Sequence, residues 1–226
     1  MYIGKLGDGS SLDDGIYVLL KEVMDNALDE YMMGYGKKID VTITGREVRV
    51  RDFGRGIPLG KVMDVASKMN TGAKYDSKVF KQSVGLNGVG IKAVNALSSQ
   101  FIVQAFRENE VKKVEFCRGE VANENKIEPT DQKNGTLVSF RPDFEIFEHY
   151  NYNYDYIETL LKNYTYLNTG LTIHFNDKVF QSKNGLVDLL NENMTSSALY
   201  PIITLKCEDL EISMTHGNQY GEEYYT

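Results

Sequence analysis

The spacing of apolar residues changes from a helical period to a strict alternation within the first fifty residues, and no other feature limits the possible folds as much. Residues 12–33 place apolar side chains every three or four positions, which predicts an amphipathic helix. Residues 39–50 then alternate apolar and polar side chains around a Gly45-Arg46 turn, which predicts a β-hairpin. A helix that leads into an antiparallel hairpin favours an α/β fold, with helices layered on a mixed β-sheet, over a doubly wound parallel sheet.

Similar patterns predict the remaining elements. Ser10, Ser11 and Asp13 precede the first helix and are candidate N-caps for it. The tyrosine-rich run 150–156 is either a stacking platform for bases or, as we favour, aromatic packing at the start of a helix. From about residue 200 the pattern changes to strand-like alternation, which indicates the start of a second domain. Helices are expected at about 59–69, 89–98, 153–166 and 185–192, and strands near 101–107, 111–118, 135–141 and 171–176.

Composition and charge argue against several classes of function. No apolar run approaches the ~18 residues of a membrane helix, and the N-terminus lacks the pattern of a secretory signal, so we expect a cytoplasmic protein without membrane contact. The formal net charge of -7 makes the chain a poor main DNA-binding surface, because such surfaces cluster Lys and Arg. We interpret the two cysteines as buried or idle thiols, and the three histidines are too scattered for a metal cage.

Four clusters of residues are candidates for chemistry, and the first lies on the predicted first helix. Glu22 and Asn26 are four positions apart and therefore share one face of the helix, at the edge of its apolar stripe. A carboxylate there is suited to accept a proton, and a carboxamide oxygen is suited to ligate Mg²⁺. A solvated acidic helix face is the alternative interpretation of this pair.

The second cluster follows the hairpin. The alternation places Asp52 on the apolar face of its strand, together with Val48 and Val50. A carboxylate that points into a core is costly unless it has a partner, and the amino group of adenine donates where a carboxylate accepts. An Asp52 that bonds the following turn, to which Gly54 and Gly56 are suited, explains the pattern equally well.

The third and fourth clusters are a glycine-rich segment and a late threonine. Residues 83–90 carry three glycines just before the predicted 89–98 helix, where backbone N–H groups are able to approach a phosphate. Their spacing is that of neither a Walker loop nor a Rossmann turn, and an ordinary helix start is the alternative. Thr136 opens a later strand, and its hydroxyl is either a partner of Asp52 and a base or an ordinary side chain at the start of a strand.

In this order and spacing, the four clusters resemble those of the GHKL ATPase superfamily, which includes gyrase-type topoisomerases, ninety-kilodalton heat-shock chaperones, sensor histidine kinases and mismatch-repair ATPases. Over essentially the whole chain, the closer resemblance is to the B subunits of two bacterial type II DNA topoisomerases, gyrase and topoisomerase IV. The segments that carry this resemblance are 1–4, 22–30, 52–58, 71–75, 94–98 and 215–217. The resemblance implies the two-layer GHKL (Bergerat) fold, with an ATPase domain over 1–195 and the beginning of a transducer domain over 196–226.

The resemblance also implies a set of contacts with ATP. Glu22 would be the general base that activates water, and Asn26 would ligate the Mg²⁺ that bridges the phosphates. Asp52 would accept from the adenine amino group with the help of Thr136, and Lys74 would add positive charge. The other implied contacts are Gly85, Leu86, Asn87, Gly88, Val89 and Gly90 at the phosphates, Arg55, Gly56, Ile57 and Pro58 around the adenine, and Arg107 at the rim, where relatives bind aminocoumarins.

For the whole protein, the resemblance implies a nucleoid-associated homodimer that works with an A-type subunit. ATP would close a gate around DNA, and hydrolysis would reset the gate after strand passage. Overall likeness favours the topoisomerase IV B subunit, with gyrase B as the alternative. Relatives carry a dimerising arm before residues 1–4 and a transducer lysine beyond Thr226, so we expect this chain to bind ATP as a monomer and to hydrolyse it slowly or not at all, as a nucleotide-sensing clamp would.

Three features depart from the gyrase pattern. Asn87 stands where many gyrases have histidine, and the stretch after Pro58 is shorter. Phe80 stands where many gyrases have a tyrosine that contacts the nucleotide, and without a hydroxyl it cannot make that contact. A chaperone or mismatch-repair ATPase would share the four clusters but not the topoisomerase-like segments 1–4 and 215–217, and a histidine kinase would need an upstream phosphoacceptor helix.

Overall fold

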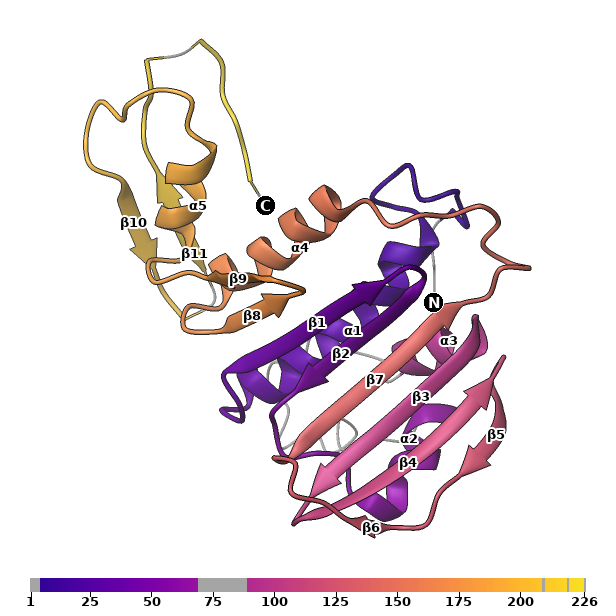
Figure 1. Cartoon of the computed structure of the whole chain (residues 1–226). Helices are drawn as coiled ribbons and strands as arrows, with labels where there is room; N and C mark the ends of the chain where they lie inside the picture. The colour runs from indigo at the N-terminus through magenta and orange to yellow at the C-terminus, as the bar shows by residue number, and fades with distance from the viewer. Residues whose placement is uncertain (1–4, 69–88, 209, 219, 226) are drawn as a thin grey trace.

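A computed structural model describes residues 5–68, 89–208, 210–218 and 220–225 of the chain (Figure 1). The main body is a two-layer sandwich of helices on a mixed β-sheet, as the change of apolar period predicts. In Figure 1, helices α1, α2 and α3 all lie behind the same face of the sheet. The core fills the space between these two layers, where Phe101, Phe116 and Phe140 of the sheet and Ile16 and Leu19 of α1 are fully buried.

The main sheet has nine strands in the order β5-β4-β3-β7-β2-β1-β8-β9, with β6 paired to β4. Strands β1 and β8 run parallel, and the other described pairs in this sheet are antiparallel. The strands are β1 (Lys38–Thr44), β2 (Glu47–Asp52), β3 (Ser98–Arg107), β4 (Glu110–Cys117), β5 (Glu120–Glu124), β6 (Glu128–Pro129), β7 (Gly135–Pro142), β8 (Thr172–Phe175) and β9 (Lys178–Gln181).

The helices follow the predicted positions closely: those near the first three predicted ranges are shorter than expected, and the last two keep their predicted length but are shifted by one residue. Sequence periodicity extends past the hydrogen-bonded turns, because apolar residues flanking a helix also pack on the core. The helices are α1 (Gly15–Met32), the 3₁₀ turn η1 (Leu59–Lys61), α2 (Val62–Ser67), α3 (Gly90–Ala96), α4 (Tyr154–Leu167) and α5 (Leu186–Asn193). The last predicted residues of the 89–98 helix instead lead into β3, which begins at Ser98.

The start of α1 differs from the prediction. The residue before the helix is Asp14, and none of Ser10, Ser11 and Asp13 caps it. The buried carboxylate of Asp14 does not bond the helix either, because it folds back and accepts from the backbone N–H groups of Gly9 at 2.8 Å and Ser11 at 3.2 Å. The Asp14 carboxylate thus bonds backbone N–H groups of the preceding loop instead of the first N–H groups of the helix.

The tyrosine-rich run packs against α1, as we favoured. Tyr17 of α1 contacts Tyr152 and Tyr156 edge-to-face, with ring centroids 6.0 Å apart in both pairs. Tyr150 is fully buried and contacts Tyr152 in the same geometry at 5.7 Å. Aromatic rings prefer such edge contacts, and the run therefore anchors the segment before α4 to the core.

A buried hydrogen bond joins α4 to α1. The Tyr164 hydroxyl donates to the carboxylate of Asp25 at 2.5 Å, and Lys21 pairs with the same carboxylate at 2.6 Å. Burial, with the negative charges of Asp25 and Glu22 nearby, raises the pKa of Tyr164 well above its ordinary value. The phenol therefore stays protonated and fixes the face of α1 that carries Glu22.

We expect Tyr164→Phe to lower the free energy of unfolding by about 2 kcal/mol, because hydrogen bonds to charged groups contribute about 1.5–3 kcal/mol. Chemical denaturation measures this loss. Tyr154→Phe is the control, since the Tyr154 hydroxyl is half-exposed and its 3.3 Å bond to the carbonyl of Ile43 is long. Equal losses in the two variants would contradict the prediction.

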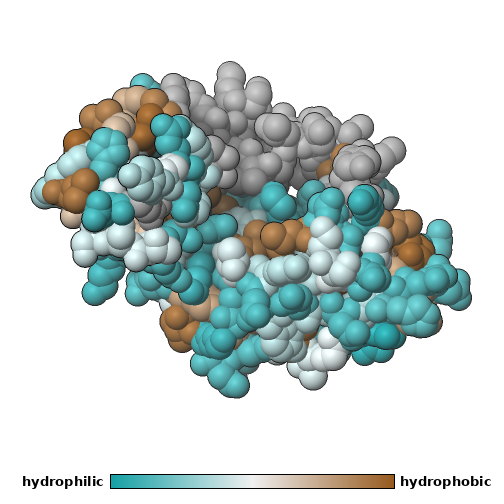
Figure 2. Space-filling view, turned by 90° about the horizontal axis from the view of Figure 1, so that it is seen from above, coloured by the Kyte–Doolittle hydropathy of each residue, from teal (hydrophilic) through white to brown (hydrophobic). Residues whose placement is uncertain are grey.

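The C-terminal part forms a separate hairpin of β10 (Ile203–Lys206) and β11 (Glu211–Met214). Helix α5 contacts both β11 and α4. Figure 2 shows apolar residues gathered over this part of the surface, at the left of the view. They include the exposed side chains of Leu199, Ile203, Leu205 and Met214. None of the helices that the structure describes is both long and apolar enough to cross a membrane.

Candidate functional site

The structure places Glu22 at the start of α3. Glu22 and Asn26 are half-buried on α1, and α1 packs directly on α3. A Cβ added to Gly90 would collide with the Glu22 carboxylate, so the carboxylate lies directly against the backbone of α3. The Asn26 amide donates from Nδ2 to the backbone carbonyl of Glu22 at 2.7 Å, which orients the carboxamide beside the carboxylate. The Glu22 carboxylate therefore faces another element of the fold, which argues against the interpretation of this position as part of a solvated acidic face.

Asp52 is a buried carboxylate held by backbone donors. Its side chain is only 7% exposed at the end of β2, on the face of Val48 and Val50 as predicted. Oδ1 accepts from the N–H of Gly54 at 2.9 Å and of Thr136 at 3.1 Å, and Oδ2 lies 3.2 Å from the same Thr136 nitrogen. The bond to the following turn is thus present, and it leaves Oδ2 with fewer backbone donors than Oδ1. The described contact from Thr136 is made by its backbone N–H and not by the hydroxyl that we expected.

Burial raises the pKa of Asp52 from its ordinary 3.8 to about 6, although the N–H donors of Gly54 and Thr136 and the charge of Arg51 oppose the rise. A carboxyl group with a raised folded-state pKa stabilises the fold fully below its unfolded-state pKa, and this contribution is lost as the pH rises through the folded-state pKa. At neutral pH the ionised Asp52 therefore costs about 3 kcal/mol of stability. Stability is given up here to keep a carboxylate at this position.

We expect Asp52→Asn to gain about 2–3 kcal/mol in unfolding free energy relative to the parent as the pH is raised from about 4 to about 7.5. Asn keeps the shape and one acceptor oxygen for Gly54 and Thr136 but does not ionise. Chemical denaturation of both proteins across this range measures the difference. A stability difference that does not change with pH would show that Asp52 has an ordinary pKa.

Arg55 forms an ion pair that the sequence analysis missed. Its guanidinium pairs with Glu30 of α1, with Nη2 at 2.9 Å from Oε1 and Nε at 3.2 Å from Oε2, and its backbone N–H donates to the same carboxylate. The guanidinium also lies over the ring of Tyr35 at 4.3 Å. Glu30 raises the pKa of Arg55, chiefly by this hydrogen bonding. Spacing alone gave no signal for Glu30, because its partner lies 25 residues away in another element.

Gly56 lets the turn after β2 approach the end of β3. It has a φ of +75°, and an added Cβ would collide with the carbonyl oxygen of Phe106 and lie 3.0 Å from that of Gly135. Arg107, the last residue of β3, reaches back to the carbonyl of Gly56 at 3.4 Å. The Ile57 side chain packs against the core, and Pro58 is exposed before η1. Arg107 thus lies beside this turn, and its place at the rim of an adenine pocket stays a prediction.

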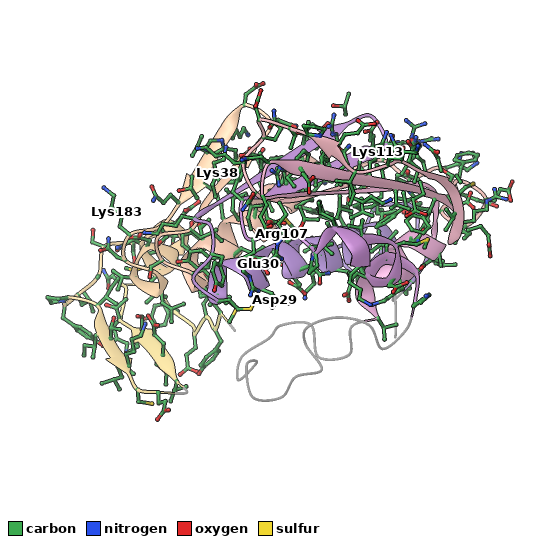
Figure 3. The ribbon with its side chains drawn as sticks, turned by 90° about the horizontal axis from the view of Figure 1, so that it is seen from below. Asp29, Glu30, Lys38, Arg107, Lys113 and Lys183 are labelled. Carbon is green, nitrogen blue, oxygen red and sulfur yellow. The ribbon has the colours of Figure 1, made fainter. Side chains whose placement is uncertain are left out.

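The charged side chains around Arg107 and the remaining predicted site residues lie as follows. On the helix side of the sheet, Figure 3 shows Glu30 and Asp29 of α1 below the strands and Arg107 close above them, whereas Lys38 and Lys113 lie on the other side. Val89 and Gly90 lie at the start of α3, next to Glu22. Lys74, Gly85, Leu86, Asn87, Gly88 and Phe80 lie outside the described residues.

This arrangement has two chemically distinct ends. One end is a buried carboxylate, Asp52, with an oxygen suited to accept a hydrogen bond from an amino group. The other is the Glu22 and Asn26 pair beside the start of α3, where a proton acceptor meets the positive end of a helix. Among the residues that the structure describes, no three His, Cys, Asp or Glu side chains are grouped to hold a metal ion.

Comparison with known proteins agrees with this geometry. The family described as histidine kinase-, DNA gyrase B-, and HSP90-like ATPases matches residues 12–146, which include α1, the β1–β2 hairpin, α3 and β7 up to its end. The chain belongs to this ATPase family. Its members share the fold that the four clusters implied, so both the predicted family and the predicted fold class are confirmed, and the chain is an ATP-binding domain.

Within the ATPase family, the chain is similar to the B subunits of type II topoisomerases. It is 49% identical to the B subunit of DNA topoisomerase 4 from Borreliella burgdorferi over 100% of this chain and 38% of that protein. It is 34% identical to the B subunit of the type 2 topoisomerase from Aquifex aeolicus over 99% of this chain and 30% of that protein. The chain therefore spans less than two-fifths of the length of these relatives.

A solved structure of the same ATPase family has the same fold. The 43K ATPase domain of Thermus thermophilus gyrase B, crystallised with an aminocoumarin, superimposes with a TM-score of 0.76 at 29% identity. The match covers 93% of this chain and 59% of that one. This structural match extends well beyond residue 146, so α4, β8 and β9 also belong to the shared fold.

Proposed function

We propose that this chain is the ATPase region of a topoisomerase IV B subunit, in which ATP binding and hydrolysis drive gate closure and DNA strand passage. The observation that supports this most is the buried Asp52, which costs stability at neutral pH and offers an acceptor oxygen. Groups that are costly to a fold are typical of functional sites, where they are kept for the ligand. The similarity to the B subunits of topoisomerases supports the same function.

In this proposal Asp52 and its surroundings bind the base. Oδ2 of Asp52 accepts from the adenine amino group, while the N–H groups of Gly54 and Thr136 hold the carboxylate in place. The ion pair of Arg55 with Glu30 lies beside the base, and Gly56, Ile57 and Pro58 shape the turn around it. Arg107 stands at the rim, where we propose that an aminocoumarin binds, since the related gyrase B domain was crystallised with such a compound.

At the other end, Glu22, Asn26 and the start of α3 would hold the phosphates and their metal ion. Glu22 takes the proton of the attacking water, and its place against Gly90 brings it to the start of α3, near the N–H groups of Val89 and Gly90 that we assign to the phosphates. The Asn26 carboxamide oxygen is a hard ligand of the kind that Mg²⁺ prefers, and Mg²⁺ in such sites takes one or two protein ligands besides phosphates and water. When bound, Mg²⁺ would neutralise charge that develops on the phosphates.

We assign residues 1–195 to the ATPase domain and 196–226 to the beginning of the transducer. The end of α5 at Asn193 and the separate β10–β11 sheet support this boundary. The exposed apolar side chains of this hairpin are suited to pack on further parts of a longer chain. Topoisomerase IV is favoured over gyrase because identity to the topoisomerase 4 protein of Borreliella is 49%, against 36% to gyrase B of Thermus thermophilus.

The test of the proposed function uses the full-length protein reconstituted with its A-type subunit. We expect ATP-dependent decatenation and relaxation of DNA by this holoenzyme in the bacterial cytoplasm and in vitro, and neither reaction with ADP in place of ATP. ATP-dependent introduction of negative supercoils would instead identify a gyrase. ATP hydrolysis without any change of DNA topology would overturn the proposal and favour another branch of the ATPase family.

A further inference from the structure

We propose that Arg51 is a positioning residue of the nucleotide site, which clamps the end of β2 to the segment before β7 and so holds Asp52 and Thr136 in register. This inference rests on the proposed function, since it assigns Asp52 to the base. Arg51 does not belong to any of the four clusters. Its side chain projects from the face of the sheet opposite to that of Asp52, because successive residues of a strand alternate.

The guanidinium of Arg51 makes two short hydrogen bonds to backbone carbonyls on two sides of the site. Nη1 donates to the carbonyl of Asp52 at 2.6 Å, and Nη2 donates to the carbonyl of Lys133 at 2.6 Å. Lys133 lies just before Gly135 and Thr136, and the N–H of Thr136 is the donor that holds the Asp52 carboxylate. One side chain therefore joins the two backbone segments that supply the acceptor and its donor.

Aromatic rings hold the guanidinium in this orientation. It lies over the ring of Phe106 at 4.2 Å and near the ring of Phe53 at 4.9 Å, and the ammonium of Lys38 lies over Phe53 at 4.4 Å. A planar fork that is stacked on rings and bonded at both tips loses little freedom when it binds, unlike a lysine ammonium. Lysine at this position would keep the charge but not the two bonds.

The backbone at Gly135 packs so closely against the clamp that a side chain does not fit there. Gly135 has a φ of +136°, and an added Cβ would lie 2.5 Å from Nη1 of Arg51 and collide with the Asp52 carbonyl oxygen. The chain approaches so closely here because Arg51 draws the Asp52 and Lys133 carbonyls toward one guanidinium. Glycine before Thr136 and arginine before Asp52 are thus two parts of one local structure.

Arg51 also changes the charge around Asp52. The charged side chains near the carboxyl group are Arg51 on β2, which lowers its pKa, and Glu30 on α1, which raises it and is itself paired with Arg55. Burial lowers the pKa of Arg51, and the negative charge of Asp40 on the neighbouring strand β1 opposes this lowering. Asp40 itself forms an ion pair with Lys38. Removing the charge of Arg51 therefore removes a cation that helps to keep Asp52 ionised for the base.

The experiment compares Arg51→Gln, Arg51→Lys and the control Arg49→Gln, which removes an exposed arginine from the same face of the same strand. Calorimetry measures the dissociation constant for Mg·ATP from about pH 5 to about pH 8, and ¹³C NMR of the Asp52 carboxyl group measures its pKa without ligand. Circular dichroism and thermal unfolding establish that each variant is folded.

We expect Arg51→Gln to bind ATP roughly tenfold more weakly at neutral pH and to raise the Asp52 pKa, because it loses a charge and two bonds. Arg51→Lys is expected to keep the Asp52 pKa near the parent value while still binding ATP more weakly, and Arg49→Gln is expected to match the parent. If Arg51→Gln keeps both the parent affinity and the parent Asp52 pKa, the inference is overturned. If the parent itself binds no ATP, the proposed function fails, whereas the carboxyl pKa still reports on the clamp.

Discussion

Glu22→Gln in the full-length protein is expected to lower the rate of ATP hydrolysis by about 10²–10⁴-fold, which is the usual contribution of a positioned proton acceptor. Gln keeps the length of Glu and one acceptor oxygen but cannot take a proton, so the dissociation constant for ATP is expected to stay close to that of the parent. The structure places the Glu22 carboxylate against Gly90 at the start of α3, whereas the Asp52 carboxylate is held by Gly54 and Thr136. Phosphate release measures turnover, and calorimetry measures binding.

The control for this prediction is Glu120→Gln, which makes the same chemical change at an exposed position of the edge strand β5. Turnover of the control is expected to equal that of the parent. A Glu22→Gln protein with near-parental turnover would show that another group takes the proton. A variant that loses ATP binding together with turnover would assign Glu22 to binding instead of catalysis.

Gly135→Ala is expected to have the largest effect on the fold near the site. The residue adopts a φ of +136°, and its Cβ would lie 2.9 Å from the carbonyl carbon of Asp52 and closer still to the oxygen. A strained backbone costs about 1–3 kcal/mol, and the collision with backbone atoms adds to that cost. We expect the free energy of unfolding to fall by about 3 kcal/mol or more and ATP binding to be lost, because Thr136 and Asp52 are pushed apart.

Two other glycines separate backbone strain from collision. Gly45 has a φ of +58° with open space around its Cβ position, so Gly45→Ala is expected to show the backbone cost alone, about 1–2 kcal/mol. Gly60 has neither a positive φ nor a neighbour within 4 Å, and Gly60→Ala is expected to be neutral. Denaturation of the three variants gives their order. If Gly135→Ala were no worse than Gly45→Ala, the close approach of Asp52 and Gly135 would be wrong.

Much of the fold follows from apolar spacing. The first helix, the β1–β2 hairpin, and strands β3, β4, β7 and β8 are long or strongly periodic, and their sequence patterns predicted them. Strands β5, β6 and β9 were missed for physical reasons. All residues of β5 are exposed, β6 has two residues, and β9 is a short, largely exposed edge strand, so none has a buried face to produce an alternation.

The sequence singles out a candidate site residue where an unusual residue type occupies a recognisable face of a helix or strand. Asp52 was singled out because a carboxylate on an apolar strand face is unusual, and the structure confirms that it is buried there. Glu22 and Asn26 were singled out because both share one helix face, and their roles stay predictions. Contacts between distant segments gave no such signal. The ion pair of Arg55 with Glu30 joins side chains of two different elements, so the spacing of residues along the sequence does not predict it. The spacing does not predict the bonds of Arg51 either, because their acceptors are the backbone carbonyls of Asp52 and Lys133.

The most direct test of the assignment of Asp52 to the base is a calorimetric titration of Mg·ATP and Mg·GTP into the parent chain and into Asp52→Asn at neutral pH. We expect the parent to prefer ATP, because guanine carries a carbonyl where adenine carries the amino group that Asp52 accepts from. In Asp52→Asn, ATP binding is expected to weaken by about 10- to 100-fold, although at neutral pH this variant avoids the cost of an ionised buried carboxylate. An Asp52→Asn protein that binds ATP as tightly as the parent would contradict the assignment of this buried carboxylate to the base.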